Sequence, residues 1–72
     1  MNANHITTPA EWGQLIRARR KQAGLSIDEL ASMLGLSPRF LSEVERGKPG
    51  ASIGRVLQIC AALGLLITIT PK

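Results

Sequence analysis

The stretch that decides the fold is IDELASMLGLSPRFLSEVER, residues 27–46. Counting from Ile27, apolar side chains occupy the fourth, eighth, tenth, fifteenth and eighteenth positions, and alanine and glycine occupy the fifth and ninth. Helices that cross closely need a small residue at the crossing, and a tight turn needs a backbone that glycine adopts at little cost. The spacing therefore predicts two short helices joined by a tight turn. The apolar positions that would hold them together are Leu30, Leu34, Leu36, Leu41 and Val44.

Start and stop signals of the same kind divide the rest of the chain. The segments TPAE at residues 8–11 and SIDE at residues 26–29 have the pattern of a capping box, in which a hydroxyl and a carboxylate satisfy the first N–H groups of a helix. Ser37 precedes a proline, which suits the first position of a helix, and Ser52 can cap a fourth helix that runs to about Leu63. A glycine follows each of the four segments, at positions 24, 35, 47 and 64. The sequence thus predicts an all-α domain of four helices over residues 8–64, behind a flexible arm at residues 1–7.

Residues 65–72 differ in character from the helical segments. The run LLITIT at residues 65–70 alternates between two faces and is rich in β-branched side chains, which predicts a β-strand. A lone strand leaves backbone groups unpaired, and the same strand of a second subunit is the simplest partner across a two-fold axis. The alternative is a frayed, extended tail.

The fourth helix is apolar over much of its circumference, whereas a surface helix needs only one apolar stripe. Burial on two sides favours contact with a partner as well as with the helix's own domain. We therefore expect a homodimer in which residues 65–72 form the dimerisation strand. The expected interface residues are Ile59, Leu63, Leu65, Leu66, Ile67, Thr68, Ile69 and Thr70.

Composition narrows the function. A chain of 72 residues makes one domain, and its net charge of +4 favours a polyanionic partner, with nucleic acid first and a membrane surface second. The alternative is that the charge only aids solubility. Cys60 is the one cysteine, so no intrachain disulfide and no metal cluster is expected, and a cytoplasmic location fits the lack of an apolar signal core. The sequence contains no catalytic constellation and no cofactor motif, so an enzyme is not expected.

These features together resemble the phage-repressor (Xre) class of helix-turn-helix regulators, and within it HipB-type antitoxins. The resemblance covers residues 13 to about 70, and its most specific parts are LIRARRKQAGLS at residues 15–26 and RFLSEVERGKP at residues 39–49. It implies a dimeric operator-binding repressor, often autoregulatory, encoded beside a HipA-like serine/threonine kinase toxin that it binds. The C-terminal strands of such proteins pair between subunits. The sequence ends without the longer tail that some of them use on the toxin. A stand-alone phage-type repressor, or a toxin-binding adaptor with weak DNA affinity, remains an alternative.

In such a motif the second helix enters the major groove of double-stranded DNA with its N-terminal residues near the base edges. Arg39 is the best candidate for direct readout, because arginine pairs bidentately with guanine. Phe40 could touch a thymine methyl group or pack against the neighbouring helix, and Ser42 could reach a base or a phosphate. Glu43 is more suited to orienting Arg39 or Arg46 than to reading cytosine. The base-reading candidates are Ser37, Pro38, Arg39, Phe40, Ser42 and Glu43.

Phosphate contacts are expected from backbone N–H groups at the start of one helix and from cationic side chains near the ends of others. For each cation the alternative is a solvated surface charge. The candidates are Arg19, Lys21, Ser26, Ile27, Arg46 and Lys48.

Two charged residues lie on otherwise apolar faces, and one glycine lies in the first turns of the first helix. Arg20 lies in the apolar stripe of the first helix, and Glu45 lies beside Val44. The resemblance implies that these two form a partly buried ion pair with a structural role. Gly13 weakens the first helix by up to about 1 kcal/mol, and the sequence offers no reason for it.

Overall fold

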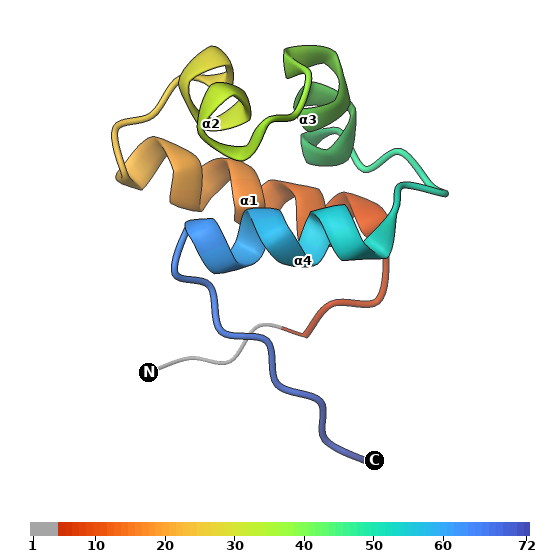
Figure 1. The fold of residues 1–72 in the computed structure, drawn as a ribbon. Coiled ribbons are helices and arrows are strands. Elements are labelled where there is room, and N and C mark those ends of the chain that lie inside the picture. Colours follow the sequence, from red (N-terminus) through yellow and green to blue (C-terminus); the bar gives the residue numbers. More distant parts are fainter. Residues whose placement is uncertain (1–4) are drawn as a thin grey trace.

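The computed structural model describes residues 5–72, and Figure 1 shows its four helices. They are α1 (Pro9–Gln22), α2 (Ile27–Leu34), α3 (Pro38–Glu45) and α4 (Ile53–Ala62). Helix α3 packs against both α1 and α2, and α2 also contacts α4. The predicted all-α, four-helix architecture is therefore confirmed. The N-terminal arm predicted at residues 1–7 lies partly outside the described residues, and residues 5–7 precede α1 without helical or strand structure.

Local hydrogen bonds explain where the helices begin. Ser26 and Glu29 form a complete capping box at the start of α2, and the Ser37 hydroxyl accepts a hydrogen bond of 3.0 Å from the backbone N–H of Phe40 in α3. The expected cap at Ser52 is wrong, because its side chain makes no capping hydrogen bond to α4. At the end of α2, Gly35 adopts a left-handed conformation with φ of 67°, which glycine tolerates without steric strain.

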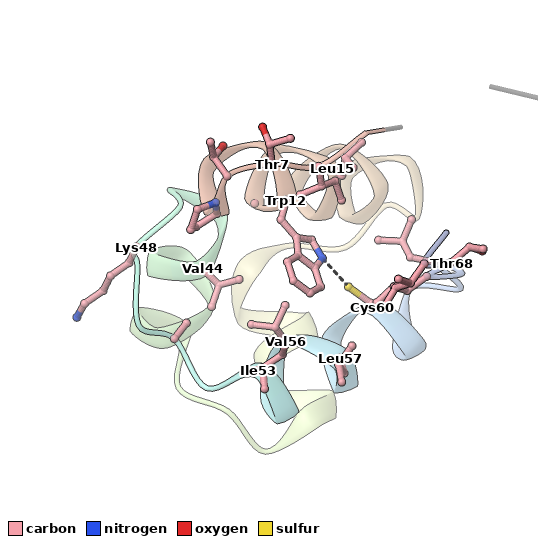
Figure 2. Close-up of a pocket in the computed structure, with 18 of the residues that line it drawn as sticks. Thr7, Trp12, Leu15, Val44, Lys48, Ile53, Val56, Leu57, Cys60 and Thr68 are labelled. Carbon is pink, nitrogen blue, oxygen red and sulfur yellow. Dashed lines mark hydrogen bonds between the residues drawn. The ribbon is translucent and has the colours of Figure 1, made fainter. Parts of the chain in front are cut away.

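One apolar core joins all four helices. Its buried members are Ile16, Leu30, Ala31, Leu41, Val44, Val56, Ile59, Cys60 and Leu63. Trp12 packs against this core, and its indole N–H donates a hydrogen bond of 3.2 Å to the Cys60 sulfur, as Figure 2 shows. Burial raises the pKa of the Cys60 thiol, although the indole hydrogen bond acts in the opposite direction. Cys60 therefore serves as a small buried hydrophobe.

Helices α1 and α3 approach each other so closely that their backbones touch. A Cβ on Gly13 would overlap the backbone carbonyl oxygens of Val44 and Glu45 at the end of α3. A Cβ on Gly47, just after α3, would overlap the backbone of Ala10 in the same way. The close crossing supplies the reason for Gly13 that the sequence did not.

The C-terminal segment corrects two expectations about the dimer. Residues 65–72 form no strand, and none occurs elsewhere in residues 5–72. A strand needs a neighbour that offers its backbone groups, and this segment has none among residues 5–72. Ile59 and Leu63 were expected at the dimer interface, and this was wrong, because they are 0% and 4% exposed inside the subunit's own core. Leu66 and Ile69, in contrast, are each 92% exposed.

Over the described part of the chain, no helix is long and apolar enough to span a membrane.

Candidate nucleic-acid interface

A buried ion pair fixes the orientation of α3 against α1. Arg20 Nε lies 2.7 Å from Glu45 Oε2, and Arg20 Nη2 lies 3.0 Å from Glu45 Oε1, so the contact is bidentate. The third nitrogen, Nη1, donates a hydrogen bond of 2.8 Å to the carbonyl oxygen of Leu25 in the loop before α2. The Glu45 carboxylate raises the pKa of the Arg20 guanidinium. One arginine thus joins α1, the end of α3 and the start of the α2 segment.

The first turn of α3 presents a cation to solvent. Arg39 is the second residue of this helix, and its side chain is 89% exposed. Pro38 before it is exposed, and Ser42, one turn later, is partly exposed. The opposite face, with Leu41 and Val44, is buried in the core. One face of α3 therefore packs firmly in the core, while its polar face stays accessible to a partner.

Glu43 lies between two cations. Its Oε2 is 3.2 Å from Lys48 Nζ and 3.9 Å from Arg39 Nε. The sequence offered Arg39 and Arg46 as partners of Glu43. The structure places Glu43 near Arg39 and adds a contact with Lys48. A carboxylate already flanked by two positive charges can stay close to a phosphate strand with less repulsion than an isolated one.

Phe40 packs inward, and a cation covers its ring. Its side chain is half-buried against the core, and the guanidinium carbon of Arg55 lies 5.5 Å from the ring centroid. The sequence left two roles open for Phe40, contact with a thymine methyl group and packing within the domain. In the structure Phe40 packs against the core. Sequence reasoning missed Arg55. The available signal was an arginine in the first turn of a helix that has no acidic residue there.

The structure changes the roles of two phosphate candidates. Arg19 Nε donates a hydrogen bond of 2.8 Å to the carbonyl oxygen of Leu63, so this side chain closes the C-terminal end of α4. The backbone N–H of Ser26 donates a hydrogen bond of 2.9 Å to the Glu29 carboxylate, so it is not available to a phosphate. The Ser26 hydroxyl accepts from the Glu29 backbone N–H, and its own proton is left over by this capping box.

The other phosphate candidates remain at the surface. Lys21, Arg46 and Lys48 are exposed, and Ile27, the first residue of α2, is partly buried.

The capping box at the start of α2 predicts an acid-sensitive contribution to stability. Hydrogen bonds from Ser26 lower the pKa of Glu29 below its ordinary value of 4.5. Because the folded-state pKa lies below the unfolded one, the stabilisation is complete above pH 4.5 and is lost as the pH falls through the folded-state pKa. The variant Glu29→Gln should therefore show a smaller decrease of Tm below pH 4.5 than the unaltered chain. Asp28→Asn, one residue away and outside the capping box, is the control, and an equal effect of both variants would contradict the assignment.

Comparison with known proteins agrees with this geometry. The family described as "Helix-turn-helix" matches residues 16–68. The uncharacterized HTH-type transcriptional regulator y4mF of Sinorhizobium fredii is 48% identical over 67 residues, which cover 93% of this chain and 88% of that protein. Such relatives are transcriptional regulators, which agrees with the expectation that this chain is not an enzyme.

Solved structures show the same fold. A HipB variant in complex with an O2 20mer superposes with a TM-score of 0.86 over 97% of both chains, at 21% sequence identity. A chain of a HipA–HipB–O2–O3 complex superposes with a TM-score of 0.85 over 96% of this chain and 97% of its own length, at 22% identity. The sequence match over residues 16–68, the similarity to y4mF and the shared four-helix fold show that this chain belongs to the Xre-type helix-turn-helix family of transcriptional regulators.

Proposed function

We propose that this chain is a sequence-specific DNA-binding repressor that acts as a homodimer, and that it is the antitoxin and autoregulator of a HipA-like kinase module. The observation that carries the proposal is the exposed first turn of α3. Arg39 projects from a helix whose other face is buried and whose end is held by the Arg20–Glu45 ion pair. A firmly packed helix with an exposed arginine near its N-terminus has the form required to read bases in the major groove.

In this proposal α3 lies in the major groove, and its side chains divide between reading and positioning. Arg39 pairs with a guanine, and Glu43 orients it from one turn further along the helix. The hydroxyl groups of Ser37 and Ser42 reach bases or phosphates, while Pro38 and Phe40 contribute shape at the edge of the contact. Phosphate contacts come from exposed cations and from the start of α2. These contacts are assigned to Lys21, the Ser26 hydroxyl, the Ile27 backbone N–H, Arg46 and Lys48.

Replacing Arg39 by alanine should weaken binding to the operator by about 1–3 kcal/mol and relax specificity at one base pair. The side chain is exposed, so Tm should not change. The measurement is a gel-shift titration at fixed salt, with the DNA upstream of the gene against a scrambled fragment. Lys72→Ala, which removes a cation at the chain end remote from α3 in Figure 1, is the control. An equal loss of affinity for operator and scrambled DNA would contradict base readout by Arg39.

An apolar groove opens beside the C-terminal segment and supports the proposed dimer. It has a volume of about 740 Å³ and runs between the N-terminal end of α1, helix α4 and the tail. Figure 2 shows Trp12, Ile53, Val56 and Leu57 along it. Ile53 is 65% exposed in the isolated chain, and contiguous exposed apolar surface of this kind is typical of an interface.

The proposed partner for this surface is the tail of a second copy. Residues 65–70 would pair with their counterpart and satisfy backbone groups that lack strand partners in the described part of one chain. The dimer would place two recognition helices roughly 34 Å apart, one turn of DNA, on an inverted repeat. Leu65 packs against its own core, so the remaining members of the expected interface carry the contact. They are Leu66, Ile67, Thr68, Ile69 and Thr70.

Replacing Ile69 by glutamate should convert the dimer to a monomer, because a charged carboxylate would be buried without a partner between the paired tails. The residue is 92% exposed in the single chain, so its folding should be retained. Light scattering after size exclusion measures the mass, and circular dichroism checks the helices. Met33→Glu introduces the same charge at another exposed apolar position, which is 63% exposed on α2. An unchanged dimer mass for Ile69→Glu would refute the proposed pairing.

The toxin partnership rests on the fold shared with a chain of the HipA–HipB–O2–O3 complex. Co-purification with the product of the adjacent reading frame tests it. A second candidate, a regulator without a toxin, is favoured by the relative y4mF, which is described only as a transcriptional regulator. A neighbouring gene that encodes no kinase would decide for this second candidate.

A further inference from the structure

Arg55 is a cation that helix stability does not explain. It is the third residue of α4, where the positive end of the helix dipole disfavours a positive side chain. It is exposed, and it forms no ion pair with a carboxylate within residues 5–72. Its contact is with the Phe40 ring, 5.5 Å from the guanidinium carbon to the ring centroid.

The contact places Arg55 at the flank of the recognition helix. Phe40 lies in the first turn of α3 and directly follows Arg39, so a group held over its ring lies close to the helix end proposed to enter the groove. Lys48 also lies on this side, but Glu43 already pairs with it at 3.2 Å. Arg55 is therefore the cation beside Phe40 whose charge no carboxylate in the described chain offsets.

The contact with the ring leaves the guanidinium able to bind an anion. The attraction to the ring acts on the charge of the guanidinium and uses none of its five N–H donors in a hydrogen bond to a carboxylate. Those donors suit the oxygens of a phosphate, which arginine binds through two parallel hydrogen bonds. Ring contact also restricts a long side chain before DNA arrives, so less conformational entropy is lost on binding.

We propose that Arg55 contacts a phosphate of the DNA strand that borders α3 on its α4 side, and that Phe40 is the positioning residue that holds the guanidinium there. The inference rests on the DNA binding proposed above. It adds a contact outside the helix-turn-helix itself and gives the half-buried Phe40 a function that needs no contact with a base.

The test measures DNA affinity against salt concentration for Arg55→Ala, Phe40→Leu and the double variant. Fluorescence anisotropy is recorded with the upstream fragment and with scrambled DNA. Arg55→Ala should weaken binding to both DNAs by a similar factor and reduce the slope of log K against log salt by about one per subunit. Lys72→Ala removes one positive charge far from α3 and should leave the slope unchanged. Circular dichroism checks that each variant is folded.

Phe40→Leu keeps an apolar side chain but removes the ring. It should weaken binding in the unaltered chain and add little further loss when Arg55 is already alanine. A change of base preference that persists in the double variant would overturn the positioning role of Phe40.

An unchanged affinity and salt slope for Arg55→Ala would overturn the phosphate contact. If the unaltered chain still preferred the upstream fragment in that case, the proposed DNA-binding function would not be affected. Failure of the unaltered chain to prefer the upstream fragment would overturn the sequence-specific function. The salt slopes on scrambled DNA would still decide the role of Arg55.

Discussion

Replacing Gly13 by alanine is expected to lower the free energy of unfolding by about 3 kcal/mol, which is near the upper end for overpacking in a core. The added methyl group would overlap the carbonyl oxygens of Val44 and Glu45. Those atoms are backbone, so no side chain can rotate away, and α1 must separate from α3. A small domain has only about 5–15 kcal/mol of stability to lose. The loss should appear as a large decrease in the urea midpoint, followed by circular dichroism.

A second helical glycine provides the matched control. Gly54 in α4 has open space around its missing Cβ, with only the Ser52 hydroxyl oxygen at 4.0 Å. Gly54→Ala should leave stability unchanged or raise it by up to about 1 kcal/mol, because alanine favours helix more than glycine does. Opposite signs for the same substitution would isolate the effect of the close helix crossing. Similar effects of Gly13→Ala and Gly54→Ala would show that helix propensity, not contact between backbones, governs position 13.

The contrast between these two glycines shows what a sequence can predict about this fold. Helix ends are set by neighbours in the chain, so the serine at position 37 and the glycine at position 35 suffice to place them. The need for glycine at position 13 comes from residues about 30 positions away, which no local pattern contains. The same holds for Arg19, whose partner Leu63 lies 44 residues further along the chain.

The sequence could not distinguish Ile59 and Leu63 from interface residues for a related reason. A helix that is apolar on two sides is expected to bury both, but periodicity does not say which side faces the helix's own core. Ile59 and Leu63 are buried in the core of the single chain, whereas Ile53 and Leu57 of α4 are exposed. For the tail at residues 65–70, alternation favours a strand, yet strand pairing is a property of two segments.

The surface proposed to bind DNA was predictable where it depended on helix geometry and not where it depended on packing. Position in the first turn of α3 sufficed to identify Arg39 as exposed. The loss of the Ser26 amide to a carboxylate follows from the same capping box that the sequence displayed, so that correction was available from local chemistry. The position of Arg55 over Phe40 depends on how α4 crosses α3, and it required the structure.

Replacing Arg20 by methionine is expected to destabilise the domain by about 3–5 kcal/mol, because it leaves an unpaired buried carboxylate. Its partner Glu45 has a side chain that is 5% exposed, so water cannot replace the two lost hydrogen bonds fully. The Leu25 carbonyl would lose its donor as well. Glu45→Met should destabilise less than Arg20→Met, since the remaining guanidinium keeps its bond to Leu25.

The double variant Arg20→Met with Glu45→Met distinguishes pairing from simple loss of volume. Two apolar side chains leave no charge in the core, so the double variant should be more stable than Arg20→Met alone. A double-mutant cycle in thermal unfolding measures this coupling. The exposed pair of Glu43 and Lys48, whose charged atoms lie 3.2 Å apart, is the control, and its coupling should not exceed about 1 kcal/mol. Additive losses at Arg20 and Glu45 would mean that the buried pair does not act as a unit, and the firm packing of α3 would then have to come from the apolar core and the close contact at Gly13.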